Sequence, residues 1–176
     1  MTVLCDWQIR ELCEASQMVW PFRPDLLNPV SIDVVLGHHL MIEVMDSKEL
    51  IQIDISTRTE DNPYMLLPGE FCLAETFETF NLPSTVSAQF VLKSSRARAG
   101  YENLFSGWCD AGWHGSKLTL ELVNARHHWS LPLYPNLKIG QMLFFQHAKP
   151  LQDYSMTGRY NNDITVMAAK SDQLAA

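Results

Sequence analysis

The sequence predicts a mainly β protein, a distorted antiparallel barrel or jelly-roll-like sandwich with one short helix in front of it. Two observations predict this class. Short runs of alternating apolar and polar residues follow one another along most of the chain, and segments rich in proline or glycine separate them. The 176 residues can bury a substantial core, and no repeat or low-complexity segment divides them. We therefore expect a single domain over residues 1–176.

The helix is expected over residues 6–19, where Asp6 can cap the first turn and Ile9, Leu12 and Cys13 fall on one face. The next segment carries three prolines and predicts an extended loop. Strands are then expected at 51–56, 85–92, 117–123 and 141–146. The turn segments LPGE, NLPST and YPNLKIG separate these strands.

Composition excludes several classes of protein. A net charge of −7 and a pI near 5.3 argue against general nucleic-acid binding, because no large basic face is available. No apolar run reaches the ~18 residues of a membrane span. The first residues lack the basic and apolar regions of a signal peptide. Four cysteines without CxxC spacing predict free thiols and a cytoplasmic location.

Positive charge concentrates in KSSRARAG, residues 93–100, although the protein as a whole is acidic. Lys93, Arg96 and Arg98 surround two serines, a combination of hydroxyls and guanidinium groups that suits phosphate oxygens. The same residues are also typical of a solvated turn with surface cations. Taken alone, the segment favours the solvated turn.

Three residues are candidates for chemistry. Glu121 lies in mid-strand between two leucines. It is solvated if its face of the sheet is open, and a general acid or base with a raised pKa if that face lines a pocket. The segment around Asp110 and Trp113 predicts a tight turn with a core tryptophan, or an aspartate that orients a sugar hydroxyl or a water. Neither pair of adjacent histidines suits a metal, and the zinc-deaminase signature is absent, so we expect chemistry without zinc.

Seven segments, in order along nearly the whole chain, resemble the dCTP deaminase branch of the dUTPase-like superfamily. They are LCDWQI (4–9), NPVSIDVVLGHHL (28–40), LLPGEFCLAETFETFNLPSTV (66–86), KSSRARAG (93–100), DAGWHGSKLTLELVN (110–124), LPLYPNLKIGQMLF (131–144) and GRYNND (158–163). The resemblance implies the distorted β-barrel of the dUTPase-like type. It also implies a homotrimer with active sites between subunits, and a mobile C-terminal lid over about residues 157–176.

The resemblance also assigns the basic segment. Ser94 and Arg98 match positions that hold the triphosphate of the nucleotide, with Lys93 and Ser95 beside them. Mg²⁺ is expected to accompany the triphosphate, with no direct protein ligand. In the tail, Arg159 is expected near the phosphates.

Other residues match family positions that act on the base or contact the sugar. Glu121 matches the catalytic glutamate, which takes a proton from water and returns protons to N3 and the departing amine, while Ser94 helps to position that water. Asp110 matches the aspartate that meets the 3′ hydroxyl. Trp113 falls against the deoxyribose, where its bulk excludes a 2′ hydroxyl, and Tyr160 is expected against the base or sugar.

The sequence departs from the family pattern at three notable positions. Ser106 stands where alanine is usual in the loop that contacts the base, and Trp108 replaces an arginine. Asp163 stands at the glutamine position of the tail, where a carboxylate repels a triphosphate unless a cation lies between them. The compact chain fits a viral or divergent bacterial version of the family.

The predicted activity is hydrolytic deamination of dCTP to dUTP and ammonia. Glu121 favours it, because monofunctional dUTPases lack this strand glutamate. Two alternatives stay open at this point. One is a nucleotide pyrophosphatase of the dUTPase type, alone or combined with deamination, and the other is a non-catalytic nucleotide-binding regulator.

Overall fold

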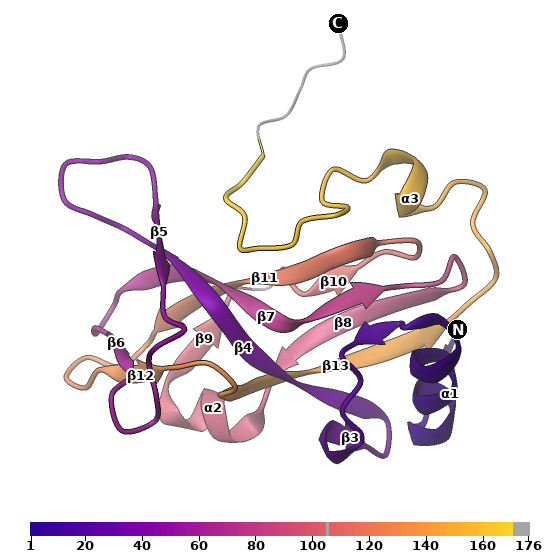
Figure 1. Ribbon diagram of the computed structural model, residues 1–176, viewed down its shortest axis with the longest axis horizontal. Coiled ribbons are helices and arrows are strands. Elements are labelled where there is room, and N and C mark those ends of the chain that lie inside the picture. The colour runs from indigo at the N-terminus through magenta and orange to yellow at the C-terminus, as the bar shows by residue number, and fades with distance from the viewer. Residues whose placement is uncertain (105, 171–176) are drawn as a thin grey trace, which may run out of the picture.

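The computed structural model describes residues 1–104 and 106–170, and it confirms the mainly β fold (Figure 1). The helical elements are α1 (Asp6–Ser16), the short 3₁₀ turn η1 (Pro24–Leu26), α2 (Ser94–Ala99) and α3 (Tyr154–Thr157). The strands of the first half are β1 (Thr2–Val3), β2 (Val19–Trp20), β3 (Leu27–Asn28), β4 (Ser31–Ile42), β5 (Ile51–Asp54), β6 (Tyr64–Leu66), β7 (Phe71–Asn81) and β8 (Val86–Leu92). Those of the second half are β9 (Tyr101–Asn103), β10 (Trp108–Cys109), β11 (His114–Asn124), β12 (Leu131–Leu133) and β13 (Lys138–Gln146).

Most of the strands form one curled sheet, in which the main path runs β10-β8-β13-β4-β7-β11-β9. The short strands β1, β2, β3 and β5 attach to β13, β7 and β4, while β12 and β6 form a separate pair. Neighbouring strands are antiparallel throughout this path. Within the described ranges, no helix has the length and apolar character needed to cross a bilayer.

Local structure differs from the sequence expectations in several places, and the long strands β4 and β7 were not among the expected strands. The first helix ends at Ser16, earlier than expected, because Gln17 adopts a left-handed conformation (φ 53°) and its N–H bonds back to Cys13. The basic segment after β8 forms the short helix α2 and not a turn, with Gly100 closing it at φ 109°.

Strand β11 carries the alternation that positions the candidate site. Leu118, Leu120 and Leu122 point into the hydrophobic core. The intervening side chains at Thr119 and Glu121 are only partly buried and lie on the opposite face. One face of β11 therefore anchors the strand in the core, while the other presents polar groups to the C-terminal segment.

The buried glutamate Glu78 in β7 makes the stability of the fold depend on pH. Its side chain is enclosed, one oxygen accepts a hydrogen bond from Val35 N at 3.1 Å, and the other oxygen has no partner among the described residues. Burial raises the pKa of this carboxyl from 4.5 to about 7. The folded protein thus holds the proton to a higher pH than the unfolded chain does.

We expect the stabilising contribution of this proton to be complete below pH 4.5 and to be lost as the pH rises through 7. The loss amounts to about 3 kcal/mol. Urea unfolding of the wild type and of Glu78→Gln between pH 4.5 and 8 measures it, since glutamine does not titrate. The free energy of unfolding of the wild type, relative to the variant, should fall by that amount, whereas parallel curves would contradict the assignment.

Candidate active site

A cavity of about 550 Å³ lies between the outer face of β11, the segment before it, and the C-terminal segment. Seven residues singled out from the sequence line it: Ser106, Trp108, Asp110, Trp113, Glu121, Tyr160 and Asp163. These residues come from four separate stretches of chain, which the curled sheet and the returning tail bring together. The cavity is therefore the candidate active site.

Glu121 lies on the wall of this cavity, so its face of the sheet lines a pocket. Its carboxylate is half-buried and accepts a hydrogen bond from the hydroxyl of Ser106. Burial raises the pKa of Glu121, and the hydrogen bond from Ser106 opposes the rise without cancelling it. A carboxyl group with a raised pKa holds its proton more readily than a solvated glutamate does, which suits a group that takes up and releases a proton during a reaction.

Asp110 and Trp113 flank the glutamate from the turn before β11. The indole Nε1 of Trp108 donates to a carboxylate oxygen of Asp110 at 2.9 Å, and the aspartate side chain stays exposed. Trp113 is almost fully buried, and its ring stacks on Phe80 with centroids 5.6 Å apart. Its position is therefore fixed by the core, so that it forms a rigid part of the wall.

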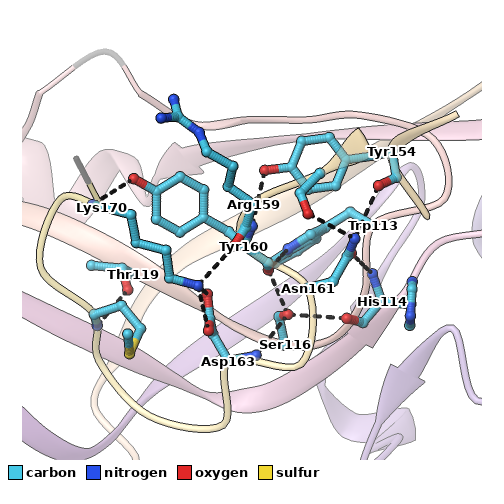
Figure 2. A network of polar contacts seen from close by, with 12 residues as sticks. Trp113, His114, Ser116, Thr119, Tyr154, Arg159, Tyr160, Asn161, Asp163 and Lys170 are labelled. Atoms are coloured by element: carbon cyan, nitrogen blue, oxygen red, sulfur yellow. Dashed lines mark hydrogen bonds and ion pairs between the residues drawn. The ribbon is translucent and has the colours of Figure 1, made fainter. Parts of the chain in front are cut away.

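The C-terminal segment closes one side of the cavity by bonding to β11 and to the turn before it (Figure 2). The carbonyl oxygen of Tyr160 accepts from Trp113 Nε1 and from the hydroxyl of Ser116, both at 2.7 Å. Lys117 N donates to the carbonyl oxygen of Asp163 at 2.8 Å. Further along, Met167 N donates to the hydroxyl of Thr119 at 3.2 Å. The segment thus follows β11 without joining the sheet as a regular strand.

Asp163 has a cationic partner. The Nζ of Lys170 lies 2.8 Å from both carboxylate oxygens of Asp163, and it also donates to the carbonyl oxygen of Arg159 at 2.7 Å. The same amine lies 5.0 Å from the ring centre of Tyr160 (Figure 2). The negative charge introduced by Asp163 is therefore balanced within the tail. Residues 171–176 of the expected lid lie outside the described part.

The basic segment lies elsewhere in the subunit. The described residues that line the cavity include neither Lys93 nor any residue of α2, and they do not include Arg159. Ser94, Ser95 and Arg98 are exposed on α2, at the opposite edge of the view from the tail (Figure 1). A single chain therefore does not unite the predicted triphosphate residues with Glu121.

Lys93 is already engaged within the subunit. Its Nζ lies 2.6 and 2.7 Å from the two carboxylate oxygens of Asp33, a buried residue of β4. Because a buried carboxylate needs a partner, Lys93 satisfies Asp33 and fixes the start of α2 against the sheet. Its predicted contact with the triphosphate stays a prediction.

Several cavity residues escaped the sequence analysis. Lys117 and Thr119 line the cavity on the same face as Glu121, and the period of two along the strand was a usable signal for both. Lys170 does not line the cavity itself, and its contact with Asp163 gave no sequence signal, because the two residues meet only through the fold of the tail. Among the described residues, no group of three histidine, cysteine, aspartate or glutamate side chains could hold a metal ion.

Comparison with known proteins agrees with this fold. Residues 3–147 match the dCTP deaminase-like family. A relative from Methanosphaerula palustris, named dCTP deaminase, dUMP-forming, is 36% identical over 162 residues, which cover 88% of this chain and 86% of the relative. A protein of the same name from Nanoarchaeum equitans is 33% identical over 180 residues, covering 89% and 90% of the two chains.

A solved structure shares the fold. It is the 2′-deoxycytidine 5′-triphosphate deaminase from Agrobacterium tumefaciens, with a TM-score of 0.65 and 21% identity. The alignment covers 81% of this chain and 47% of that one, so this chain spans about half its length. Together with the motifs and the cavity, these matches show that the chain belongs to the dCTP deaminase-like family.

Proposed function

We propose that the protein deaminates dCTP by hydrolysis, with Glu121 as the proton carrier. The observation that carries the proposal is the half-buried Glu121 carboxylate on the wall of a nucleotide-sized cavity, with burial raising its pKa. The relatives named dCTP deaminase supply the substrate class. A regulator that only binds nucleotide has no need of a carboxylate held in this state.

The reaction follows from these groups. Ionised Glu121 takes a proton from water, and the resulting hydroxide attacks C4 of cytosine. Protonated Glu121 gives this proton to N3, then takes the proton of the new hydroxyl on C4 and delivers it to the amine, which leaves as ammonia while C4=O forms. The Ser106 hydroxyl, which donates to Glu121, orients the carboxylate. The zinc-deaminase signature is absent from the sequence, and the proposed route uses no zinc.

Asp110 and Trp113 are proposed to recognise the sugar. The exposed Asp110 carboxylate can accept a hydrogen bond from the 3′ hydroxyl, and Trp113 offers a rigid wall to the deoxyribose ring. Since the core holds Trp113 in place, it cannot move aside for a 2′ hydroxyl. The proposal therefore includes rejection of CTP.

We extend the proposal to a homotrimer in which each site is shared. Ser94, Ser95 and Arg98 project into solvent on α2, away from the cavity of their own subunit. A neighbouring subunit that presented its α2 to this cavity would bring the triphosphate residues to Glu121. Three chains of 20.1 kDa give a mass near 60 kDa, which light scattering can test.

Mg²⁺ and location complete the proposal. No protein cluster among the described residues holds a metal by itself, so we assign Mg²⁺ to the triphosphate, whose oxygens it prefers. The four cysteines are all free, as suits a reducing compartment such as the cytoplasm. The predicted contacts of Lys93 and Arg159 with the phosphates, and of Tyr160 with the base or sugar, belong to the same proposal.

The Asp163–Lys170 pair gives a prediction for nucleotide affinity. Lys170→Met leaves the Asp163 carboxylate unbalanced beside the cavity, where it repels an anionic ligand. We expect the Kd for the triphosphate to rise about fivefold, which corresponds to about 1 kcal/mol for a partly exposed pair. Calorimetry with Mg²⁺ present measures this change.

The control for this prediction is a second substitution. Asp163→Asn in the Lys170→Met background removes the unbalanced charge, so most of the lost affinity should return. Lys149→Met, at an exposed lysine outside the cavity, should leave the Kd unchanged. Equal losses with and without Asp163 would show that the pair does not control the charge near the ligand.

The experiment that tests the function measures ammonia and pyrophosphate separately for dCTP, dUTP and CTP. Ammonia from dCTP and none from CTP is the expected result. Because the relatives are named dUMP-forming, we also expect pyrophosphate to accompany the ammonia. Ammonia alone would make dUTP the product, whereas pyrophosphate from dUTP without ammonia from dCTP would contradict deamination.

A further inference from the structure

Glu75 in β7 is a buried carboxylate that the proposed chemistry does not use. The residue has no exposed surface, yet it lies between the sheet and the C-terminal segment. Burial alone would raise the pKa of Glu75. The hydrogen bonds and the charge of Lys117, together with hydrogen bonds from groups on β4, outweigh this effect and keep the pKa below its ordinary value. Glu75 is therefore a buried, ionised group with partners on every side.

The two carboxylate oxygens have different partners. Oε1 lies 2.7 Å from Lys117 Nζ and 3.2 Å from both His38 N and His39 Nδ1, all within the sheet. Oε2 accepts from Val166 N at 2.8 Å and from the Thr165 hydroxyl at 3.0 Å, both in the tail. One oxygen thus bonds to the sheet and the other bonds to the tail.

The neighbouring residues pack closely around the side chain of Glu75. A side-chain carbon at Gly37 would lie 2.7 Å from both Cγ and Oε1 of Glu75, so the glycine provides the space. Val166 is buried where its N–H reaches Glu75. Lys117, bonded to the same carboxylate, lines the cavity. Glu75 therefore connects the cavity wall with the part of the tail between Asp163 and Lys170.

We propose that Glu75 is a positioning residue, which acts on the reaction by holding the C-terminal segment against the cavity and without touching the nucleotide. The role in the reaction rests on the proposed function. Glutamine at this position keeps the size but replaces one acceptor by an NH₂ group. That NH₂ group would face either the Val166 N–H or the Lys117 ammonium. Both of these are hydrogen-bond donors, so the hydrogen bond on that side would be lost.

The experiment compares Glu75→Gln with Glu78→Gln, a second buried glutamate of β7 whose hydrogen bond goes to β4 and not to the tail. Hydrogen exchange of the full-length protein without nucleotide is measured first. We expect Glu75→Gln to speed exchange of the Val166 amide about 10- to 100-fold while the amides of β7 and β11 stay protected. Glu78→Gln should leave the tail unchanged.

The kinetic effect of the substitution is expected mainly in KM, because the proton carrier Glu121 stays intact. Glu75→Gln should raise KM for dCTP about tenfold and change kcat less than about threefold, because the tail is loosened while the proton carrier stays in place. Thr165→Val removes one tail donor only, so it should give a smaller effect in the same direction. The exchange readout needs no turnover, so it decides the role of Glu75 even if deamination itself is disproved.

Three results would overturn the proposal. The first is unchanged exchange at residues 159–170 in both Glu75→Gln and Thr165→Val. The second is equal loosening of the tail by Glu78→Gln, which would make the effect a general loss of sheet stability. A fall in kcat of the same size as the rise in KM would likewise place Glu75 in the chemistry and not in the positioning of the tail.

Discussion

Glu121→Gln is expected to bind dCTP with nearly normal affinity and to lose ammonia release by about 10²–10⁴-fold. The substitution keeps the size of the side chain and can still accept from the Ser106 hydroxyl, but it cannot carry a proton. Binding is measured by calorimetry, and deamination by an ammonia assay at saturating substrate. The loss should appear in kcat and not in KM.

The matched control for this variant is Glu102→Gln. Glu102 is an exposed carboxylate in β9, paired with Val123 of β11, and it lies outside the cavity. It should retain the wild-type rate. Near-normal ammonia release by Glu121→Gln would remove Glu121 from the mechanism and, with it, the main support for the proposed function.

Arg98→Ala is expected to raise the Kd for the nucleoside triphosphate about 10- to 150-fold, which corresponds to 1.5–3 kcal/mol for a lost charged hydrogen bond. The monophosphate should lose much less, because it lacks the terminal phosphates. Arg98 is exposed on α2, so its substitution should leave the stability of the fold unchanged, and a thermal melt checks this.

Arg96→Ala serves as the comparison for Arg98→Ala. Arg96 lies on the same short helix, but its Nε donates to the carbonyl oxygen of Lys138 at 2.9 Å, within the subunit. It should affect triphosphate affinity far less than Arg98 does. Equal losses of monophosphate and triphosphate affinity in Arg98→Ala would show that this residue does not contact the phosphate tail.

The fold class was predictable because several strands, β11 above all, alternate along the sequence and the turns between them are marked by proline and glycine, whereas β4 and β7 are buried along most of their length and gave no such pattern. The run of leucines from Leu118 to Leu122 indicated both the strand and its core face. The helix α2 was missed because six residues carry no helical period, and so short a helix depends on its surroundings and not on its own propensity. Lys93, bonded to Asp33, is part of those surroundings.

The site was predictable only in part. Alternation places Glu121 opposite the leucines, but it cannot tell an open face from a cavity, since the tail that covers it comes about 40 residues later. Glu75 gave no signal at all, because its partners Lys117 and Val166 lie 42 and 91 residues away along the chain. Asp163 was identified as a source of repulsion, and only the folded tail reveals Lys170 beside it.

The claim that each site is shared between subunits is tested most directly by mixing two impaired variants. Glu121→Gln and Arg98→Ala are co-expressed with different tags, trimers containing both are purified, and ammonia release from dCTP is measured. If one subunit supplies Glu121 and its neighbour supplies Arg98, about one third of the sites in these mixed trimers combine two intact residues. The mixed trimers should then recover about a third of the wild-type rate at low substrate concentration, whereas a rate no higher than the mean of the two variants would contradict a shared site.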